Sequence, residues 1–197
     1  DFLTWEQVQK VDKYGTIASH GYDHPHLTTL SKSEIKEDVK QSIDDIEENL
    51  GKKPDFFSYP YGEYNQYVRN TVKGLGFKAV FNQNLGVVAQ ESNSYDLNRI
   101  AVSKASELDT KLAYDYLPAE WISRDEMVTD GHVTRVKVEV APEIEKAQLY
   151  VSGHGWRRVE LEQGILDVEL DLELKYSRNR IFLKTYDNKL SGKLIMK

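Results

Sequence analysis

The spacing of apolar residues predicts one long helix in the front half of the sequence. Apolar residues recur at the helical period between 32 and 50. Ser31 and Glu34 stand at the spacing of a capping box, which satisfies the first backbone N–H groups of a helix. Gly51 then suits a helix end, and Pro54 prevents the helix from continuing. These signals predict a helix over residues 32–50.

Shorter elements alternate around this helix. A short helix is predicted from Thr4, which can cap it, to Gly15, and a further helix over 67–75. The strand candidates are the short apolar runs at residues 16–19, 55–59 and 77–81. Strands that alternate with helices in this way indicate an α/β fold with parallel strands and helical crossovers.

The pattern changes after Ser103. Residues 104–131 read as a connecting segment with one helical signal and turn residues. Beyond it, apolar and charged residues alternate, most regularly from 166 to 174, which is the pattern of a strand with one buried face. The six strand runs begin near residues 136, 147, 156, 166, 180 and 192. We therefore predict three parts, 1–103, 104–131 and 132–197, the last a small antiparallel β-sandwich.

Composition narrows the possible functions. The 197 residues are 40% hydrophobic and 29% charged, with a formal net charge of −6, so no general basic field favours nucleic acid or an anionic membrane. The absence of cysteine excludes disulfides and thiolate metal sites. No apolar run is long enough to span a membrane, and no signal region is visible at the start.

A histidine-rich segment, residues 19–27, follows the first strand candidate. His20 and His24 are four residues apart, so a compact loop can bring both imidazoles to one divalent ion. The same spacing also fits a polar loop whose histidines cap backbone groups. Spacing alone leaves both readings open.

A second distinctive segment, residues 57–65, follows the next strand candidate. Pro60 restricts the backbone, and Gly62 allows another backbone or a ligand to approach closely. By itself this segment also fits a tight turn with aromatic packing.

Together, in this order and spacing, the two segments resemble the polysaccharide deacetylase family (the NodB-homology, carbohydrate esterase 4 group). Residues 2–7, 50–54 and 76–79 around them agree with the resemblance. The branch that acts on poly-N-acetylglucosamine and related exopolysaccharides is the most similar. The resemblance covers residues 1–103.

The resemblance implies a partly closed (β/α) barrel that hydrolyses the amide bond of N-acetyl groups on an amino-sugar polysaccharide. It implies a divalent metal, usually zinc, held by one Asp and two His, which map onto His20 and His24, with His26 outside the ligand set. It also implies an oxyanion contact from the backbone N–H of Tyr61. The substrate contacts that it implies are Tyr59, Pro60, Tyr64 and Arg99, and Arg99 is equally compatible with a structural role.

Three parts of the family pattern are missing from this sequence. The Asp-Asp motif, which supplies the third ligand and the general base, should precede His20, yet none of the upstream residues matches it. The late Leu-x-His motif has no histidine in the corresponding stretch, 95–102, and residues 57–59 replace an expected Arg. We therefore expect the first barrel strand to be missing. A companion segment, either an N-terminal part of the same gene product or a partner chain, should complete the barrel and its metal site.

Two functions follow. The first is a metal-dependent N-deacetylase that is extracellular or periplasmic by family resemblance, with only part of its active site in this chain. The second is a non-catalytic carbohydrate-binding or scaffolding protein derived from a deacetylase. The sequence assigns no site to residues 132–197.

Overall fold

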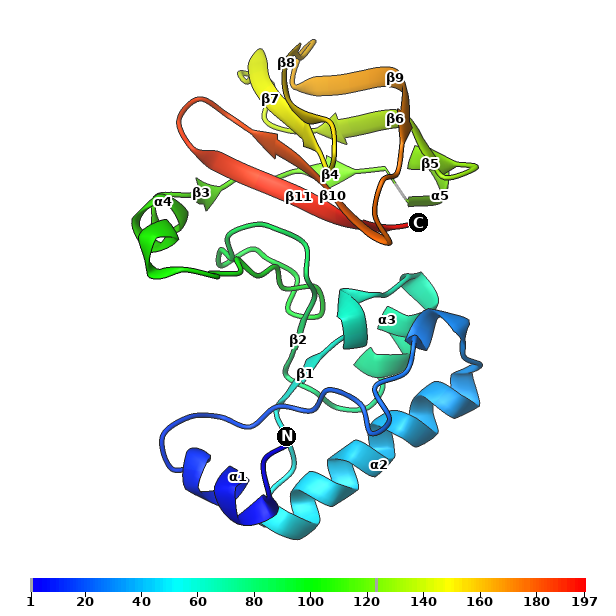
Figure 1. Ribbon diagram of the computed structural model, residues 1–197, viewed down its shortest axis with the longest axis vertical. Coiled ribbons are helices and arrows are strands. Elements are labelled where there is room, and N and C mark those ends of the chain that lie inside the picture. Colours follow the sequence, from blue (N-terminus) through cyan, green and yellow to red (C-terminus); the bar gives the residue numbers. More distant parts are fainter. Residues whose placement is uncertain (1, 123) are drawn as a thin grey trace. The chain divides into compact units, whose positions relative to one another are not determined.

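The computed structural model describes residues 2–122 and 124–197 (Figure 1). Its helices and short 3-10 helices are α1 (Trp5–Val11), η1 (Leu27–Thr29), α2 (Lys32–Leu50), η2 (Pro60–Gly62), α3 (Gln66–Lys73), η3 (Ala105–Glu107), α4 (Leu108–Leu112) and α5 (Arg124–Met127). Its strands are β1 (Phe56–Ser58), β2 (Ala79–Phe81), β3 (Asp115–Tyr116), β4 (Glu120–Trp121), β5 (Val128–Thr129), β6 (His132–Glu139), β7 (Lys146–Val151), β8 (Gly155–Glu160), β9 (Ile165–Glu173), β10 (Arg178–Lys184) and β11 (Lys189–Met196). No helix in the described part of the chain is long and apolar enough to cross a membrane.

Contacts group the chain into two units. The first unit comprises residues 1–83 and 91–97, and the second comprises 84–90 and 98–197. The chain therefore passes between the units three times. The predicted division at residues 103 and 131 stays a prediction of domain organisation.

The long predicted helix of the first unit is confirmed as α2. The Ser31 hydroxyl accepts the Glu34 backbone N–H, and the Glu34 carboxylate accepts the Ser31 N–H, so the capping box is complete. Gly51 ends the helix with a left-handed φ of 71°. Ile35 and Val39 of the apolar stripe are fully buried, and Ile43 and Ile46 are nearly so, so the periodicity identified the packed face correctly.

The two short helices of the first unit are confirmed with shifted ends. The first begins after its Thr4 cap as predicted but ends at Val11, well before Gly15. The second, α3, is capped by Asn65, whose side chain accepts the Val68 N–H, and ends at Lys73. Helix ends fray and respond to local capping, so their limits are the least predictable part of a helix.

The parallel arrangement of the first unit's strands is also confirmed. β1 pairs with β2 in parallel, with Phe57 opposite Val80. Single parallel bridges extend this sheet, from Ser19 to Phe57 on one side and from Phe81 to Leu97 on the other. The predicted strand 16–19 is thus reduced to one bridging residue, Ser19.

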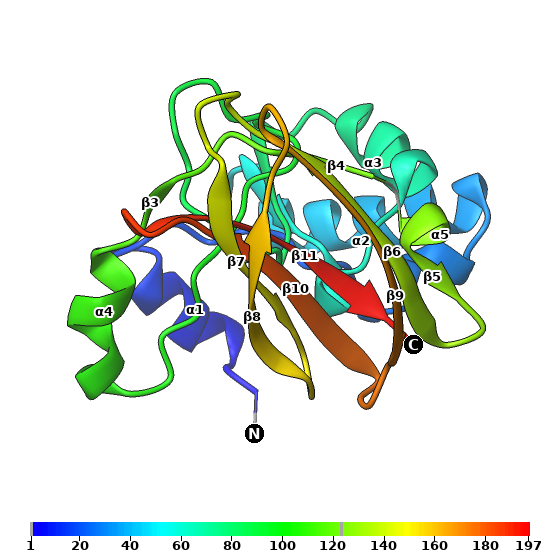
Figure 2. The same ribbon diagram turned by 90° about the horizontal axis from the view of Figure 1, so that it is seen from above.

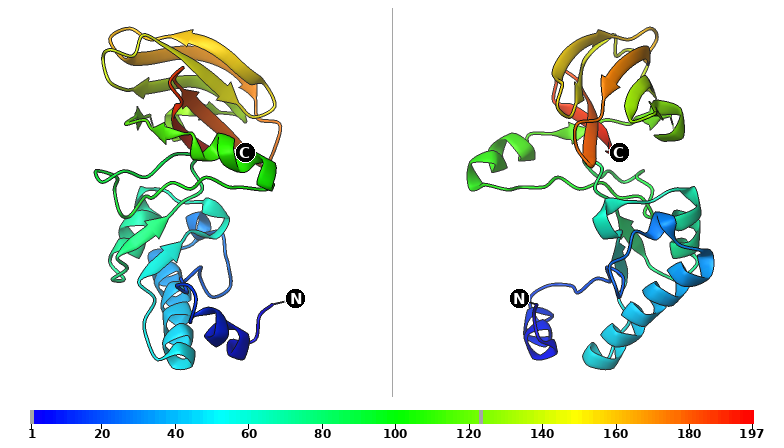
Figure 3. Two further views of the ribbon diagram at one scale, coloured as in Figure 1. Left: turned by 90° about the vertical axis from the view of Figure 1, so that its left-hand side faces the viewer. Right: turned by 45° about the vertical axis from the view of Figure 1, so that its right-hand side comes forward.

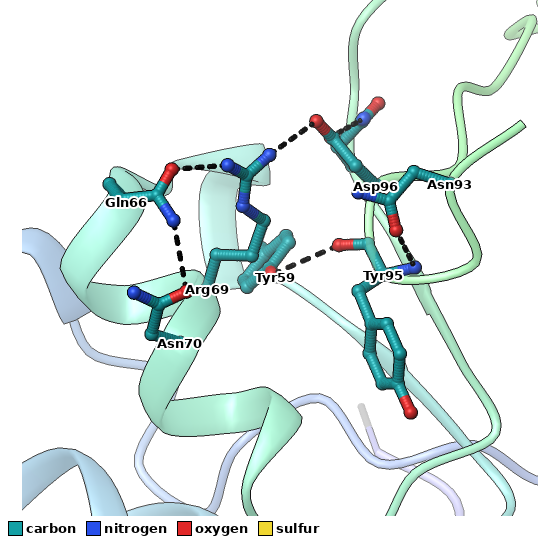
Figure 4. A network of polar contacts seen from close by, with 8 residues as sticks. Tyr59, Gln66, Arg69, Asn70, Asn93, Tyr95 and Asp96 are labelled. Carbon is teal, nitrogen blue, oxygen red and sulfur yellow. Dashed lines mark hydrogen bonds and ion pairs between the residues drawn. The ribbon is translucent and has the colours of Figure 1, made fainter.

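A polar network fixes the segment 91–97 beside β2 (Figure 4). The Asp96 carboxylate accepts hydrogen bonds from Arg69, at 3.2 Å, and from the Asn82 amide. The Tyr59 hydroxyl donates to the Tyr95 carbonyl at 3.4 Å. Burial raises the pKa of Tyr59 well above its ordinary value, and the Asp96 charge raises it further.

The second unit is built from strands, as predicted. Its six expected strands are confirmed as β6 to β11, and the two-residue strands β3, β4 and β5 were not foreseen. One antiparallel group has the order β8-β7-β10-β11, with β3 added in parallel, and the other is centred on β6 and β9 (Figure 2). The two groups form two layers of strands (Figure 3). Side chains from both groups, among them Val136, Leu149 and Ile181, form one buried cluster.

Candidate active site

The histidine loop starts beside the end of β1. The Ser19 N–H donates to the Phe56 carbonyl at 2.9 Å, and the Ser58 N–H donates to the Ser19 carbonyl at 2.9 Å. The Ser19 hydroxyl also bonds that of Ser42 on α2 at 2.8 Å in a buried setting. His20 therefore emerges at the carboxyl end of a strand position, where parallel sheets present functional groups.

Helix α2 holds the loop in place through one carboxylate. Asp38 accepts the backbone N–H groups of Tyr22, at 3.2 Å, and Asp23, at 2.9 Å. Gly21 has a φ of 82°, and a Cβ atom there would lie 2.7 Å from an Asp38 carboxylate oxygen. Only glycine fits this position without displacing the carboxylate. The sequence alone did not reveal the role of Asp38, although its position on the polar side of a well-predicted helix was available.

The two predicted ligands face each other. His20 Nε2 and His24 Nε2 lie 3.1 Å apart. The His20 Nδ1–H donates to the Ser58 carbonyl at 2.6 Å, which leaves the lone pair of a neutral imidazole on Nε2. His24 reaches this position with a left-handed φ of 52°, a conformation that costs a non-glycine residue energy and is concentrated at functional sites.

The Tyr-Pro-Tyr-Gly turn meets the histidines from the end of β1. Tyr61 also has a left-handed φ, 56°, and its ring lies edge-on to His24 with centroids 4.3 Å apart. Gly62 has a φ of 74°, and a Cβ there would lie 2.5 Å from Gln83 Cβ. The turn is therefore held close to its neighbours, as the Pro-Gly pattern indicates.

His26 was predicted to be a loop residue outside the ligand set. In the structure its ring contacts both the turn and a buried carboxylate. Its ring stacks on that of Tyr61, with centroids 4.1 Å apart and an interplanar angle of 6°. Its Nδ1 lies 2.9 Å from the buried carboxylate of Glu63. Glu63 Oε1 is buried and has no hydrogen-bond partner among the described residues. No pattern in the sequence predicted the contact between His26 and Glu63, which are 37 residues apart.

The other predicted site residues have different surroundings. Pro60 is buried at the start of η2, and Tyr59 is fully buried in the first unit's core, where its ring stacks on Tyr64 with centroids 4.9 Å apart. Arg99 belongs to the second unit, where its N–H donates to the Asn84 carbonyl and burial lowers its pKa. The assignment of these residues as substrate contacts stays a prediction.

The histidine pair fits two of the ligand positions of a divalent ion. Two imidazole nitrogens, each about 2.0–2.1 Å from a zinc ion, lie at most about 4.2 Å apart, and the observed 3.1 Å is within this limit. The hydrogen bond from His20 Nδ1 to a carbonyl is the second-sphere contact typical of metal-binding histidines. In the described part of the chain, no group of three His, Cys, Asp or Glu side chains is arranged to hold a metal.

Comparison with known proteins relates the segment that carries these residues to a known family. Residues 3–80 match the family model described as polysaccharide deacetylase. The chain is 28% identical over 108 residues to chitin deacetylase 1 of Cryptococcus neoformans, and 29% identical over 66 residues to a bifunctional xylanase/xylan deacetylase of Cellvibrio japonicus. These matches cover 52% and 34% of this chain, but only 23% and 10% of the respective relatives.

A solved structure of a polysaccharide deacetylase from Bacillus cereus shares the fold. It superposes with a TM-score of 0.50 at 15% identity, over 56% of this chain and 36% of that chain. The family match includes both the histidine loop and the Tyr-Pro-Tyr-Gly turn. Residues 3–80 of this chain therefore match the polysaccharide deacetylase family.

Proposed function

We propose that this chain carries part of the active site of a metal-dependent deacetylase that removes N-acetyl groups from an amino-sugar polysaccharide. The observation that carries the proposal is the 3.1 Å approach of His20 Nε2 and His24 Nε2 inside the family-matching segment. Two imidazoles that converge at the end of a parallel strand suit a metal site better than a binding surface, which needs no such pair.

His20 and His24 are the proposed ligands of a divalent cation, with zinc as the proposed ion. When bound, such an ion polarises a carbonyl and lowers the pKa of a bound water. The Ser58 carbonyl fixes the His20 tautomer and ring orientation. Asp38 fixes the loop backbone between the two histidines through the N–H groups of Tyr22 and Asp23.

The turn around Tyr61 is the proposed oxyanion contact. Its backbone conformation is held by Gly62 and by the packing of the Tyr61 ring against His24 and His26. A rigid N–H donor stabilises developing negative charge without having to reorganise during the reaction. Tyr64 and Arg99 remain proposed substrate contacts, together with Tyr59 and Pro60.

Three further parts complete the proposal. Family resemblance supports the first unit as part of a (β/α) barrel, and two groups of strands around one buried cluster support the second unit as a small β-sandwich. A carboxylate ligand and a general base are proposed to come from a segment outside residues 1–197, either in the same gene product or in a companion chain. The proposed location is extracellular or periplasmic.

Zinc titration by calorimetry, on the complete gene product or on this chain together with its companion chain, tests the ligand assignment. We expect His20→Ala and His24→Ala each to abolish measurable zinc binding, and His154→Ala in the second unit to leave it unchanged. Equal zinc binding by all three variants and the parent chain would refute the assignment. Acetate release from chitin oligosaccharides, measured with and without a chelator and with the complete gene product, then tests the activity. Sugar binding with neither zinc binding nor acetate release would favour the non-catalytic alternative.

A further inference from the structure

One face of the second unit carries a row of aromatic rings that point away from its core. Along β7 and β10, Leu149 and Ile181 are buried in the core, and the alternate residues Tyr150 and Phe182 lie on the opposite face. Trp156 on β8 pairs directly with Tyr150, which in turn pairs with Phe182. The row therefore crosses three adjacent strands at one level.

The rings of this row are in contact and reach solvent at one edge. The Tyr150 centroid lies 5.2 Å from that of Trp156 and 5.1 Å from that of Phe182. Trp156 is on β8, the edge strand of this sheet, and is 46% exposed. Cross-strand aromatic pairs contribute only about 0.2–1 kcal/mol each to a sheet. Stabilisation of the sheet alone therefore gives little reason to expose a tryptophan.

Cationic side chains flank the aromatic row on the same face. Arg158 and Lys184 both pair with Gln148, two residues along from the row, and Arg180 lies two residues from Phe182 on the other side. The Lys184 ammonium lies 5.4 Å from the centre of the Trp156 ring. Within the described residues, no ion pair involves the side chains of Arg158, Arg180 or Lys184.

The other layer of the second unit shows that this is not a general property of its surface. On β6 and β9, Arg135 forms an ion pair with Asp167, and His132 lies 2.6 Å from the Asp171 carboxylate. Arg135 and Lys137 on that layer are thus paired with carboxylates of the same protein. The aromatic face keeps its cations available although the whole chain has a net charge of −6.

We propose that the face formed by Tyr150, Trp156, Phe182, Arg158 and Lys184 binds an acidic polysaccharide. The apolar side of a sugar ring can stack on the exposed Trp156 ring. Carboxylate or phosphate groups on the polymer pair with Arg158 and Lys184, since guanidinium and ammonium groups form strong charge-assisted hydrogen bonds to such anions.

The choice of a glycan rests in part on the proposed deacetylase function. Single-stranded nucleic acid also binds basic surfaces with aromatic rings, but residues 3–80 match a polysaccharide-modifying family. The positive charge on this face also indicates which stretches of the polymer it binds. Deacetylated amino sugars carry ammonium groups, which Arg158 and Lys184 repel, so the face favours acidic, still acetylated stretches.

Binding measurements on the full chain test this proposal. The probes are hyaluronate oligosaccharides, which carry both carboxylates and N-acetyl groups, chitin oligosaccharides, chitosan oligosaccharides, polyglutamate and oligothymidylate. We expect hyaluronate to bind, with an affinity that falls as salt rises, and chitosan not to bind. Preferential binding of oligothymidylate, or equal binding of polyglutamate and hyaluronate, would overturn the assignment to a glycan.

Variants locate the binding on the molecule. Trp156→Ala, and the double variant Arg158→Gln with Lys184→Gln, should each weaken hyaluronate binding by about tenfold. Matched controls are Tyr186→Ala, an exposed tyrosine in a turn of the same unit, and Lys137→Gln on β6; both should bind like the parent chain. Unchanged hyaluronate affinity in Trp156→Ala and in the double variant would refute the site.

The two proposals fail separately. His20→Ala should abolish zinc binding and leave hyaluronate affinity unchanged, because the aromatic face lies wholly in the second unit. Loss of acetate release with retained hyaluronate binding would count against the proposed function alone. Retained zinc binding and acetate release with no hyaluronate binding would count against the aromatic face alone.

Discussion

The two units use the same backbone strain for different purposes. Among the described residues of the first unit, the non-glycine residues with left-handed φ are His24 and Tyr61, whose ring centroids lie 4.3 Å apart. In the second unit they are Asp130, Gln163 and Asn188, which lie in turns between strands. In the first unit the strained residues bring side chains together, whereas in the second unit they allow the chain to reverse direction. The conformation alone does not identify a site; what the side chain meets there does.

The units also differ in how their strands are held. The strands β1 and β2 pair over three residues and are extended only by single bridges. In the second unit β10 and β11 pair over seven residues, and the two layers enclose one apolar cluster. The first unit relies on helices and on polar networks around its loops, whereas the second relies on long ladders and packing between layers.

The largest expected effect lies in the core of the second unit. Leu149→Ala removes a fully buried side chain between its layers, and should lower the free energy of unfolding of that unit by about 2–5 kcal/mol. Hydrogen exchange read peptide by peptide measures each unit separately. Protection of α2 should not change. An equal loss of protection in both units would break the comparison, because it would mean that they unfold together.

The next largest effect compares the stability contributed by a partly buried ion pair in the first unit with that of an exposed ion pair in the second. Asp96→Asn in the first unit weakens a carboxylate that accepts from both Arg69 and Asn82 in a partly buried network, at a cost of about 1–3 kcal/mol. The control is Arg135→Gln, which breaks an exposed pair with Asp167 and should cost less than about 1 kcal/mol. Urea unfolding measures both variants. A larger loss of unfolding free energy in Arg135→Gln than in Asp96→Asn would contradict the view that polar networks stabilise the first unit.

The cap of α2 should have a smaller effect. Ser31→Ala removes the acceptor for the Glu34 N–H and should cost about 1 kcal/mol. The Ser31 hydrogen bonds lower the pKa of Glu34 in the folded chain. The contribution of Glu34 is therefore present above its ordinary pKa of 4.5 and is lost as the pH falls through the folded value. In the variant, an NMR titration should show the pKa of Glu34 moving back up, whereas an unchanged pKa would exclude this cause.

The smallest expected effect compares strain at a turn with strain at the site. Gln163 and Gly164, both with left-handed φ, form a two-residue turn closed by hydrogen bonds between Glu162 and Ile165. Gln163→Asn should raise stability by a few tenths to about 1 kcal/mol, because Asn-Gly suits such a turn. Tyr61→Gly relieves a similar strain but removes the ring packing against the histidines, so no net gain is expected. Thermal unfolding measures both, and a clear gain for Tyr61→Gly would mean that this packing contributes little.

The parts of the fold that were predictable are those in which several local signals agree. For α2, the apolar period, the capping box and Gly51 all specify the same limits, and the structure reproduces them. The alternation from 166 to 174 likewise identified β9. The strand at 16–19 was overestimated, because pairing with Phe57 involves only Ser19. Short strands depend on which partner is within reach, and that information lies elsewhere in the chain.

The site was predictable only where its residues are close in sequence. His20 and His24 were singled out from their spacing, and they do converge. The contacts of Asp38 with the loop, and of Glu63 with His26, join residues 15 to 37 positions apart. No periodicity or motif encodes such contacts, because they arise from the way the helix and the turn pack on the sheet.

The three passages of the chain between the units have an evolutionary consequence. Asn84 accepts the Leu194 N–H at 2.8 Å, and Gly86 forms a bridge with Ser191, so two partners of β11 precede the stretch 91–97 that returns to the first unit. A gene fragment that starts at residue 98 would leave these partners behind. A single breakpoint that moves the second unit intact must therefore lie before residue 84, and the moved fragment then also takes the stretch 91–97 away from the first unit.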